Sequence, residues 1–157
     1  MATEKWIAGS GQGLTWGAAM GSSDPNSLAS GNAILSSQQI DNSAAYDVFA
    51  DLSVSLGSVT PGAGAPYIGF YLYPLNEDGS SYGHGRFGSA AAGPPPSQYY
   101  VGSIPCVPST AGVITGAIRG IILPPGKFKF VLYNLAGGAL AASSNAVDYR
   151  TYNRSVA

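Results

Sequence analysis

Charge is scarce in this sequence. Asp, Glu, Lys and Arg make up only 10% of its 157 residues, whereas soluble domains usually carry about 25%. Eight acidic residues are nearly balanced by seven basic ones, so the formal net charge is -1. A surface of this kind gives little electrostatic repulsion between copies. The composition therefore favours a chain that packs against neighbouring subunits over a small soluble protein with a neutral polar coat.

Histidine and cysteine are nearly absent as well. The one histidine, His84, lies in the glycine-rich stretch GSSYGHGRFGS, so a Ser-His-Asp site would depend on a single loop residue. The one cysteine, Cys106, excludes an internal disulfide and any metal site with several thiolates. We expect Cys106 to be a small buried apolar residue. The sequence predicts no enzyme activity and no cofactor.

Other common ligand sites are missing too. Glu77 and Asp78 lie in LNEDGS, which suits a turn but lacks the alternating oxygen ligands of a calcium loop. The stretch GSGQGLTWG has glycines without the terminal Lys-Ser or Lys-Thr of a phosphate loop. Seven scattered basic residues do not form the basic stripe of a nucleic-acid-binding protein. We therefore expect neither a metal ion nor nucleic acid as a ligand.

Long apolar runs are also missing. No stretch approaches the roughly 20 apolar residues of a membrane span. The N-terminal MATEKWIAGSGQG has no apolar run after Lys5, so the sequence predicts neither a secretory signal nor a membrane anchor. We expect a chain that is made in a cytoplasm and assembled there into something larger.

Alternation of apolar and polar residues is the strongest pattern that the sequence does contain. A period of two is typical of a half-buried strand. It extends through residues 46–59, 67–73 and 127–133. The apolar side of these stretches holds Val48, Ala50, Leu52, Val54 and Leu56 in the first, Ile68, Phe70 and Leu72 in the second, and Phe128, Phe130 and Leu132 in the third.

Weaker strand patterns cover residues 34–41, 99–104, 113–123 and 146–153, between turn clusters such as TPGAGAP and LPPG. No segment shows the apolar stripe of a capped helix. Roughly seven or eight strands predict an all-β antiparallel sandwich of immunoglobulin-like or jelly-roll type. We assign this sandwich domain to residues 34–157. Residues 1–33 are rich in Gly, Ser, Ala and Asn, and they predict an extended N-terminal arm or long loop without core elements.

Tyrosines line the opposite face of one predicted strand. Tyr67, Tyr71 and Tyr73 alternate with its apolar residues, and Tyr99 and Tyr100 open a later strand. Tyrosine is common at interfaces, because its ring buries area at low entropy cost and its hydroxyl keeps a hydrogen bond. This tyrosine row predicts a protein interface. Stacking on sugars, and burial under a second layer of the same chain, are the alternatives.

Two lysines stand out in a chain with so few charges. Lys127 and Lys129 alternate with Phe128 and Phe130, which places them on the outer face of their strand. Charges on an edge strand discourage the addition of a foreign strand. We interpret the lysines as solvated residues that protect such an edge, with acidic residues of a partner as the alternative.

The C-terminal segment carries a family likeness. A strand, then LPPGKFKFVLYN, a Gly/Ala turn and a closing VDYRTYN resemble the end of small structural proteins of tailed bacteriophages. In size, β content, low charge and Gly/Ser-rich terminal arm, the whole chain resembles the jelly-roll capsid decoration, or cement, proteins of these phages. The likeness in detail is limited to the segment from LPPG onward.

The resemblance implies a non-enzymatic virion protein on the outer face of a capsid, which bridges neighbouring major capsid proteins as a dimer or trimer. It implies stabilisation by mass action, because such a protein binds the assembled lattice and not its separated subunits. The expected lattice contact is the arm with Trp6 and Trp16, and the expected self-association surface is the tyrosine row. A phage tail or host-attachment module and a carbohydrate-binding β-sandwich are the alternative functions.

Overall fold

The computed structural model describes residues 4–8, 16–82 and 91–156. These residues form strands and a single short 3-10 helix, η1. Three of the strands have only two residues each, which leaves eight longer ones. The elements are β1 (Glu4–Ala8), β2 (Gly17–Ala18), β3 (Asn32–Leu35), β4 (Ile40–Asp41), β5 (Phe49–Val59), β6 (Tyr67–Pro74), β7 (Ala91–Ala92), η1 (Ser97–Tyr99), β8 (Tyr100–Pro105), β9 (Gly112–Ile122), β10 (Lys127–Leu135) and β11 (Ala146–Val156).

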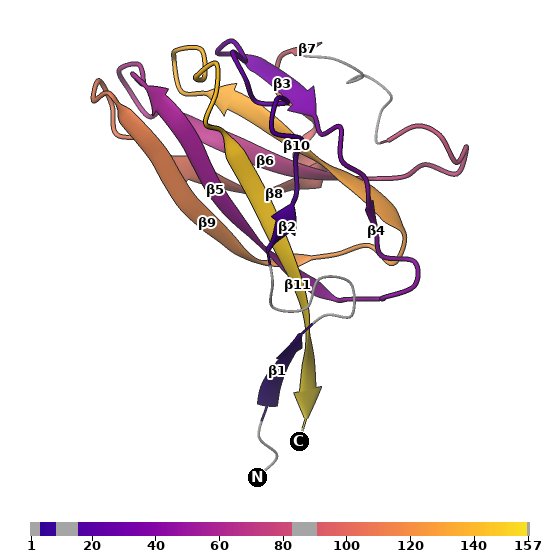
Figure 1. Ribbon diagram of the computed structural model, residues 1–157. Coiled ribbons are helices and arrows are strands. Elements are labelled where there is room, and N and C mark those ends of the chain that lie inside the picture. Colours follow the sequence, from indigo (N-terminus) through magenta and orange to yellow (C-terminus); the bar gives the residue numbers. More distant parts are fainter. Residues whose placement is uncertain (1–3, 9–15, 83–90, 157) are drawn as a thin grey trace.

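Two antiparallel sheets face each other as a sandwich (Figure 1). The first sheet has the order β1-β11-β5-β9, with β2 also beside β11. The second has the order β7-β3-β10-β6-β8, with β4 also beside β10. The predicted all-β antiparallel sandwich is thereby confirmed, whereas its assignment to the jelly rolls stays a prediction.

The main core fills the space between the sheets. Ile68, Phe70 and Leu72 of β6 and Phe128, Phe130 and Leu132 of β10 all belong to it, as the alternation predicted. β5 contributes Ala50, Leu52, Val54 and Leu56 from its inner face. Val48 was assigned to the same face, but it precedes β5 and is 46% exposed. Cys106 lies in this core as expected, and burial raises the pKa of its thiol.

Residues 19–28 also contribute to the core. Ala19, Met20 and Leu28 are buried within it, and the backbone N–H of Ala19 donates to the carbonyl of Val147 at 2.8 Å. The side-chain amide of Asn134 donates to the carbonyl of Leu28 at 2.8 Å. The expectation that residues 1–33 hold no core elements is therefore wrong for this part of the segment.

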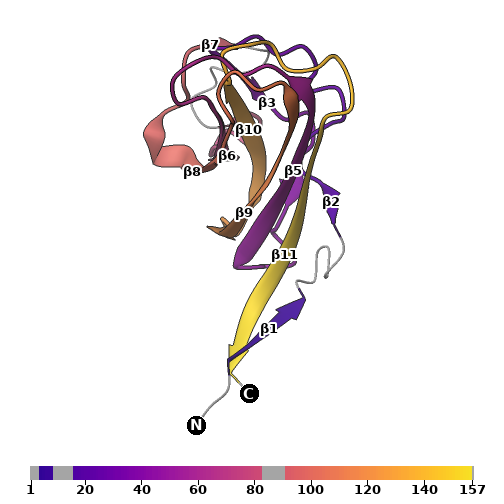
Figure 2. The same ribbon diagram turned by 90° about the vertical axis from the view of Figure 1, so that its left-hand side faces the viewer.

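The first and last strands leave the sandwich together. β1 pairs with the end of β11, from Ala8 opposite Tyr152 to Glu4 opposite Val156. Pairing of β11 with β5 ends at Tyr152, so among the described strands only β1 pairs with residues 153–156. The result is a two-stranded ribbon that projects beyond both sheets (Figure 2). No helix within the described ranges has the length and apolar character needed to cross a membrane.

The two sheets approach closely where β8 and β9 face each other. A Cβ atom added at Gly116 would lie 2.8 Å from Cδ1 of Ile104, and one at Gly102 would lie 2.8 Å from Cγ2 of Ile118. Each glycine thus makes room for an isoleucine of the opposite sheet. This reciprocal packing closes one side of the sandwich.

Replacing Gly116 by alanine is expected to lower the free energy of unfolding by about 1–3 kcal/mol, because the new methyl group overpacks the contact with Ile104. Gly112→Ala is the matched control on the same strand, since nothing lies within 4 Å of its added Cβ. Urea unfolding of both variants measures the difference. Equal stability of the two variants would show that the contact between Gly116 and Ile104 can adjust to the added methyl group, and would contradict the prediction.

Candidate functional site

The ribbon is anchored to the sandwich by buried polar groups. The side-chain oxygen of Asn153 accepts from the N–H of Val48 at 2.8 Å, and its amide donates to the carboxylate of Asp47 at 2.9 Å. Asn42 accepts from the N–H of Asp47 at 2.8 Å and donates to the carbonyl of Pro124 at 2.8 Å. Asn42 and Asp47 are 3% and 2% exposed. The start of the ribbon is therefore fixed relative to both sheets.

Exposed apolar side chains gather at the same end of the molecule. Tyr46 and Val48 precede β5, whose first residue pairs with Ile122 on one side and with Tyr152 of the ribbon on the other. We call the set the collar. It consists of Ile7, Trp16, Tyr46, Val48 and Ile122, which are between 41% and 73% exposed. Exposed apolar patches of this kind mark interaction surfaces.

Tyr46 has an unusual backbone within the collar. Its φ angle is 51°, a left-handed conformation that is uncommon for residues other than Gly, Asn and Asp. Tyr46 is also 64% exposed, so burial in the core does not compensate for the strain. Strained residues concentrate at functional sites, which makes Tyr46 a candidate contact residue.

A charged cluster lies beside the ribbon. The carboxylate of Asp51 on β5 accepts from Nη1 of Arg119 at 3.1 Å, from Nη2 of Arg150 at 3.0 Å and from the hydroxyl of Tyr152 at 3.1 Å. The guanidinium of Arg150 lies 4.8 Å from the ring centroid of Trp16. The cluster therefore links β5, β9 and β11 to the residue that precedes β2.

An irregularity in β9 explains how one carboxylate reaches so many donors. The register shifts between Ala50 and Leu52, so that Arg119 and Gly120 both lie opposite Asp51. Gly120 adopts a φ of 70°, which glycine reaches without strain. Its N–H donates to Asp51 at 3.1 Å. Bulges often redirect a side chain in this way, and here the bulge brings the Arg119 guanidinium to the carboxylate.

The Asp51 cluster makes stability depend on pH. Burial alone would raise the pKa of Asp51, but hydrogen bonds from Arg150, Gly120 and Tyr152 outweigh it and hold the pKa below its ordinary value of 3.8. Because the pKa of Asp51 is lower in the folded state than in the unfolded state, the ionised carboxylate stabilises the fold fully above pH 3.8. This stabilisation is lost as the pH falls through the folded-state pKa.

Asp51→Asn is expected to lower the free energy of unfolding near neutral pH by about 2 kcal/mol, less than for a fully buried pair, since the Arg119 side chain is 65% exposed. The stability difference from the unmodified chain should shrink as the pH falls below 3.8, because Asp51 then loses its charge in both states. Denaturant unfolding of both proteins at a series of pH values measures this difference in the free energy of unfolding. A difference that is constant with pH would contradict the cluster's role.

The tyrosine row is largely buried instead of exposed. Tyr71 and Tyr73 are 6% and 0% exposed and form a second apolar layer on the outer face of β6 and β10. The Tyr73 ring lies 4.7 Å from that of Tyr99, and the Tyr71 ring 5.4 Å from that of Tyr100. Burial raises the pKa of Tyr73 to about 12. The alternative of a second layer within the chain holds for these rings. Tyr67 packs against the same layer, and only Tyr100 is strongly exposed, at 47%.

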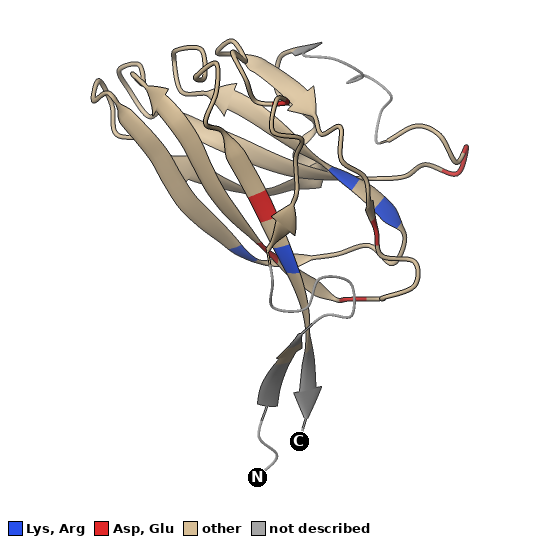
Figure 3. Ribbon diagram, viewed as in Figure 1, with Lys and Arg blue, Asp and Glu red and all other residues tan. Residues whose placement is uncertain are grey.

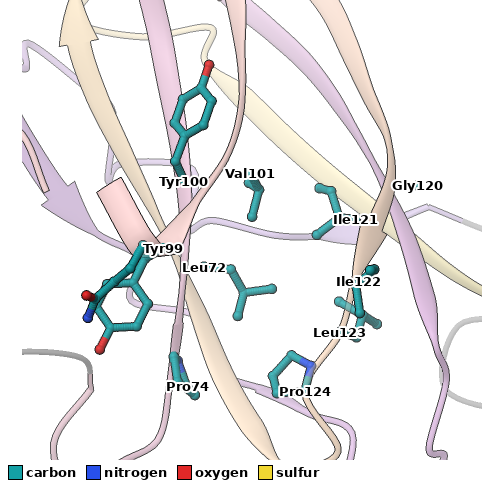
Figure 4. A pocket seen from close by; sticks show the side chains of 11 residues that line it. Leu72, Pro74, Tyr99, Tyr100, Val101, Gly120, Ile121, Ile122, Leu123 and Pro124 are labelled. Carbon is teal, nitrogen blue, oxygen red and sulfur yellow. The ribbon is translucent and has the colours of Figure 1, made fainter. Parts of the chain in front are cut away.

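An open groove separates the lower parts of the two sheets. Its volume is about 540 Å³. Leu72 lies at its centre, and Val101 and Ile121 face each other from β8 and β9 (Figure 4). Tyr99 and Tyr100 line the β8 side. The groove is mainly apolar, with hydroxyl and amide groups at its margin.

The lysines of β10 do not protect an edge. β10 lies between β6 on one side and β3 and β4 on the other, so the sequence-based interpretation as edge protection is wrong. Nζ of Lys127 lies 3.8 Å from the carboxylate of Asp41, and Nζ of Lys129 lies 5.1 Å from the ring centroid of Tyr82. Elsewhere the described chain carries few charged residues, on loops as well as on strands (Figure 3).

The comparisons with known proteins assign no family. No family model and no curated protein matches this chain. The residues with described positions contain no group of three or more His, Cys, Asp or Glu that could hold a metal ion. Asp78 accepts hydrogen bonds from the backbone of Ser80 and Ser81 at 2.8 Å, as expected of a turn residue. His84 lies outside the described residues.

Of the expected contact residues, the structure brings Trp16 to the ribbon end, where it belongs to the collar. Trp6 is placed there by the register of β1, opposite Arg154. Sequence reasoning missed Tyr46, Val48 and Ile122. Tyr46 and Val48 read as part of a strand, and Ile122 as the end of another. No signal in the sequence shows that these ends meet at the ribbon.

Proposed function

We propose that the chain is a non-enzymatic structural protein of a virion, which decorates a bacteriophage capsid and stabilises it by bridging major capsid proteins. The ribbon end of the sandwich supports this proposal most strongly. The ribbon and the collar residues lie at the same end of the sandwich, and the collar includes a Trp and a Tyr, residue types that dominate binding energy at interfaces. Attachment through this end leaves the rest of the sandwich outside the lattice.

The ribbon itself favours a partner. A two-stranded antiparallel pair is marginally stable in water without further packing. Residues 153–156 and β1 extend past the last pairing of β11 with β5. Contact with a capsid surface would supply the missing packing, and the bases of the strands are already held by Asn153.

Low charge and strand order also agree with the proposal. A net charge of -1 permits many copies to lie close together on one shell. The first and last strands are neighbours, and the chain crosses between the sheets repeatedly. This order is compatible with the jelly-roll fold that the family resemblance implies. The virion surface is accordingly the proposed location.

The proposed mechanism is mass action. A protein that binds the assembled lattice but not its separated subunits stabilises the shell in proportion to its binding free energy. The bridging contact requires that one copy, or one oligomer, touches two capsid subunits at once. The ribbon and the collar around its base offer contacts in more than one direction.

Binding to particles tests the function. Particles of the virus that encodes the chain, prepared without it, should bind the purified protein to saturation and resist heat better once it is bound. Free major capsid protein should not bind it. Binding to tail structures alone would instead favour the host-attachment alternative and would contradict decoration.

Carbohydrate binding is the second candidate, because Tyr100 is 47% exposed beside the apolar groove. Aromatic rings of this kind can stack on sugars. An array of glycans probed with the isolated protein decides the matter. Hits that disappear in Tyr100→Ala would support this candidate, and an array without hits would remove it.

A further inference from the structure

β9 is the longest free edge of the molecule's described sheets. It is the last strand of the first sheet and pairs with β5 alone. At 11 residues it exceeds the other end strands, β1 with five, β7 with two and β8 with six. The edge of a sheet presents unpaired N–H and C=O groups that can pair with another chain. Figure 2 looks onto this edge of the sandwich.

The edge is regular over its central part. Pairing with β5 continues without a shift from Ile114 opposite Leu56 to Ile118 opposite Leu52. The neighbouring edge, β8, is less suited to pairing, because its register with β6 shifts after Phe70 and it ends in Pro105. Bulges and prolines are common means of blocking an edge, and β9 has neither between Ile114 and Ile118.

Charge does not protect β9 either. Arg119 is its one charged residue, and that guanidinium is already paired with Asp51 at 3.1 Å. An acidic partner strand would have to compete with Asp51, and a basic one would be repelled by Arg119. The edge therefore fits an uncharged strand that carries β-branched residues on one face.

We propose that β9 pairs with β9 of a second copy, antiparallel and about a two-fold axis at Gly116, so that the two five-stranded sheets become one. This symmetry places Ile114 opposite Ile118 of the second copy, and the reverse. Both isoleucines are buried in the core, at 6% and 9% exposure, so the main core continues across the axis. Cross-strand pairs of β-branched residues stabilise sheets.

The outer face of the pair matches as well. Thr115 lies opposite Ala117 of the second copy, and Val113 opposite Arg119. The two Arg119 side chains start about 20 Å apart along the strands, at 3.4 Å per residue, so like charges do not meet. Val113, which is 61% exposed in one chain, is covered by the aliphatic stem of Arg119.

Of the collar residues only Ile122 lies on β9, at the end of the strand and outside the central pairs proposed here, and Tyr46 and Trp16 lie on other segments. This dimer replaces the tyrosine row as the self-association surface, since Tyr71 and Tyr73 are buried. The inference stands independently of the capsid proposal. Loss of particle binding and loss of the dimer are therefore separate results.

Sedimentation equilibrium of the full chain tests the dimer. The unmodified protein should have twice the 15.9 kDa mass of one chain. The double variant Thr115→Lys/Ala117→Lys should have the mass of one chain at the same concentration, because it places four lysines along the joined edges. Ser55→Lys is the matched control, since Ser55 is exposed on the same sheet and pairs with Thr115 one strand further in. It should remain a dimer.

Thermal melting verifies that all three proteins are folded, and hydrogen exchange gives a second readout. Those amides of residues 114–118 that do not bond to β5 should become more protected as the concentration of the unmodified chain rises. A monomer at every concentration would overturn the proposal, as would a double variant that is still dimeric. A monomeric chain whose double variant alone fails to bind particles would assign β9 to the capsid, and would overturn the proposal as well.

Discussion

Tyr73→Ala is expected to lower the free energy of unfolding by about 3–5 kcal/mol, as for other large buried rings. The Tyr73 side chain is fully buried in the second layer and packs on the Tyr99 ring at 4.7 Å. Truncation would leave a cavity beneath Tyr99 that backbone strands on either side cannot close. Chemical denaturation followed by circular dichroism measures the loss.

Tyr100→Ala is the matched control for this prediction. Tyr100 is 47% exposed and contacts the Tyr71 ring edge to face, so its removal should cost about 1 kcal/mol. Similar, small losses in both variants would contradict a structural role for Tyr73. They would restore the whole row as a candidate interface.

Truncation of three collar residues is expected to weaken attachment to particles at least about 30-fold. In the triple variant Tyr46→Gly/Val48→Ser/Ile122→Ser, each substitution removes an exposed apolar side chain from the collar. Hot-spot residues contribute 2 kcal/mol or more each, and 1.4 kcal/mol corresponds to a tenfold change in affinity. One hot spot among the three would therefore weaken binding about 30-fold, and two about 1000-fold. Titration of particles with labelled protein measures the affinity.

The fold should survive these substitutions. Glycine at position 46 fits the φ of 51° and relieves about 1 kcal/mol of strain, which offsets part of the entropy that glycine loses on folding. The melting temperature should therefore change little. Stable protein with reduced affinity is the expected combination, whereas an unfolded variant would mean that the collar is structural.

The matched control removes exposed apolar groups from the opposite end. Val107 and Leu135 are 67% and 36% exposed. They lie at the end of the sandwich where β5 ends, because the backbone of Pro61 and Gly62, just after β5, bonds to Ser109 and Ala136, which lie close to them in the sequence. Val107→Ser/Leu135→Ser should bind particles like the unmodified chain. Equal losses in both sets would show that attachment does not depend on the ribbon end.

The strand faces were predictable from the sequence because alternation is a local property. Ile68, Phe70 and Leu72 could be assigned to one side of β6 from their spacing alone, and the structure confirms it. The same spacing assigned Tyr71 and Tyr73 to the other side correctly. It could not show that a second layer covers them, since that depends on which strands lie beside β6.

The order of the strands within each sheet could not be predicted from the sequence. Lys127 and Lys129 alternate as edge residues would, but β10 is an inner strand. Asp51 and Arg150 are 99 residues apart along the chain, and no local pattern brings them together. Ala19, Met20 and Leu28 reach the core from a segment outside the long strands. Their spacing therefore shows no alternation of apolar and polar residues that could have predicted their burial.

The ribbon end was predicted only in part. Trp6 and Trp16 stood out as the large rings of a Gly/Ser-rich segment, and both lie at or beside the ribbon. The other half of the surface comes from the approach to β5 and the end of β9. These ends meet only because β5 lies between β9 and β11.

Copy number in purified virus particles tests the central proposal most directly. Quantitative mass spectrometry of particles, calibrated against the major capsid protein, counts the chain per shell. We predict a copy number comparable with that of the major capsid protein, or a simple fraction of it set by the lattice. A few copies per particle, or none, would contradict the proposal that this sandwich decorates and stabilises a capsid.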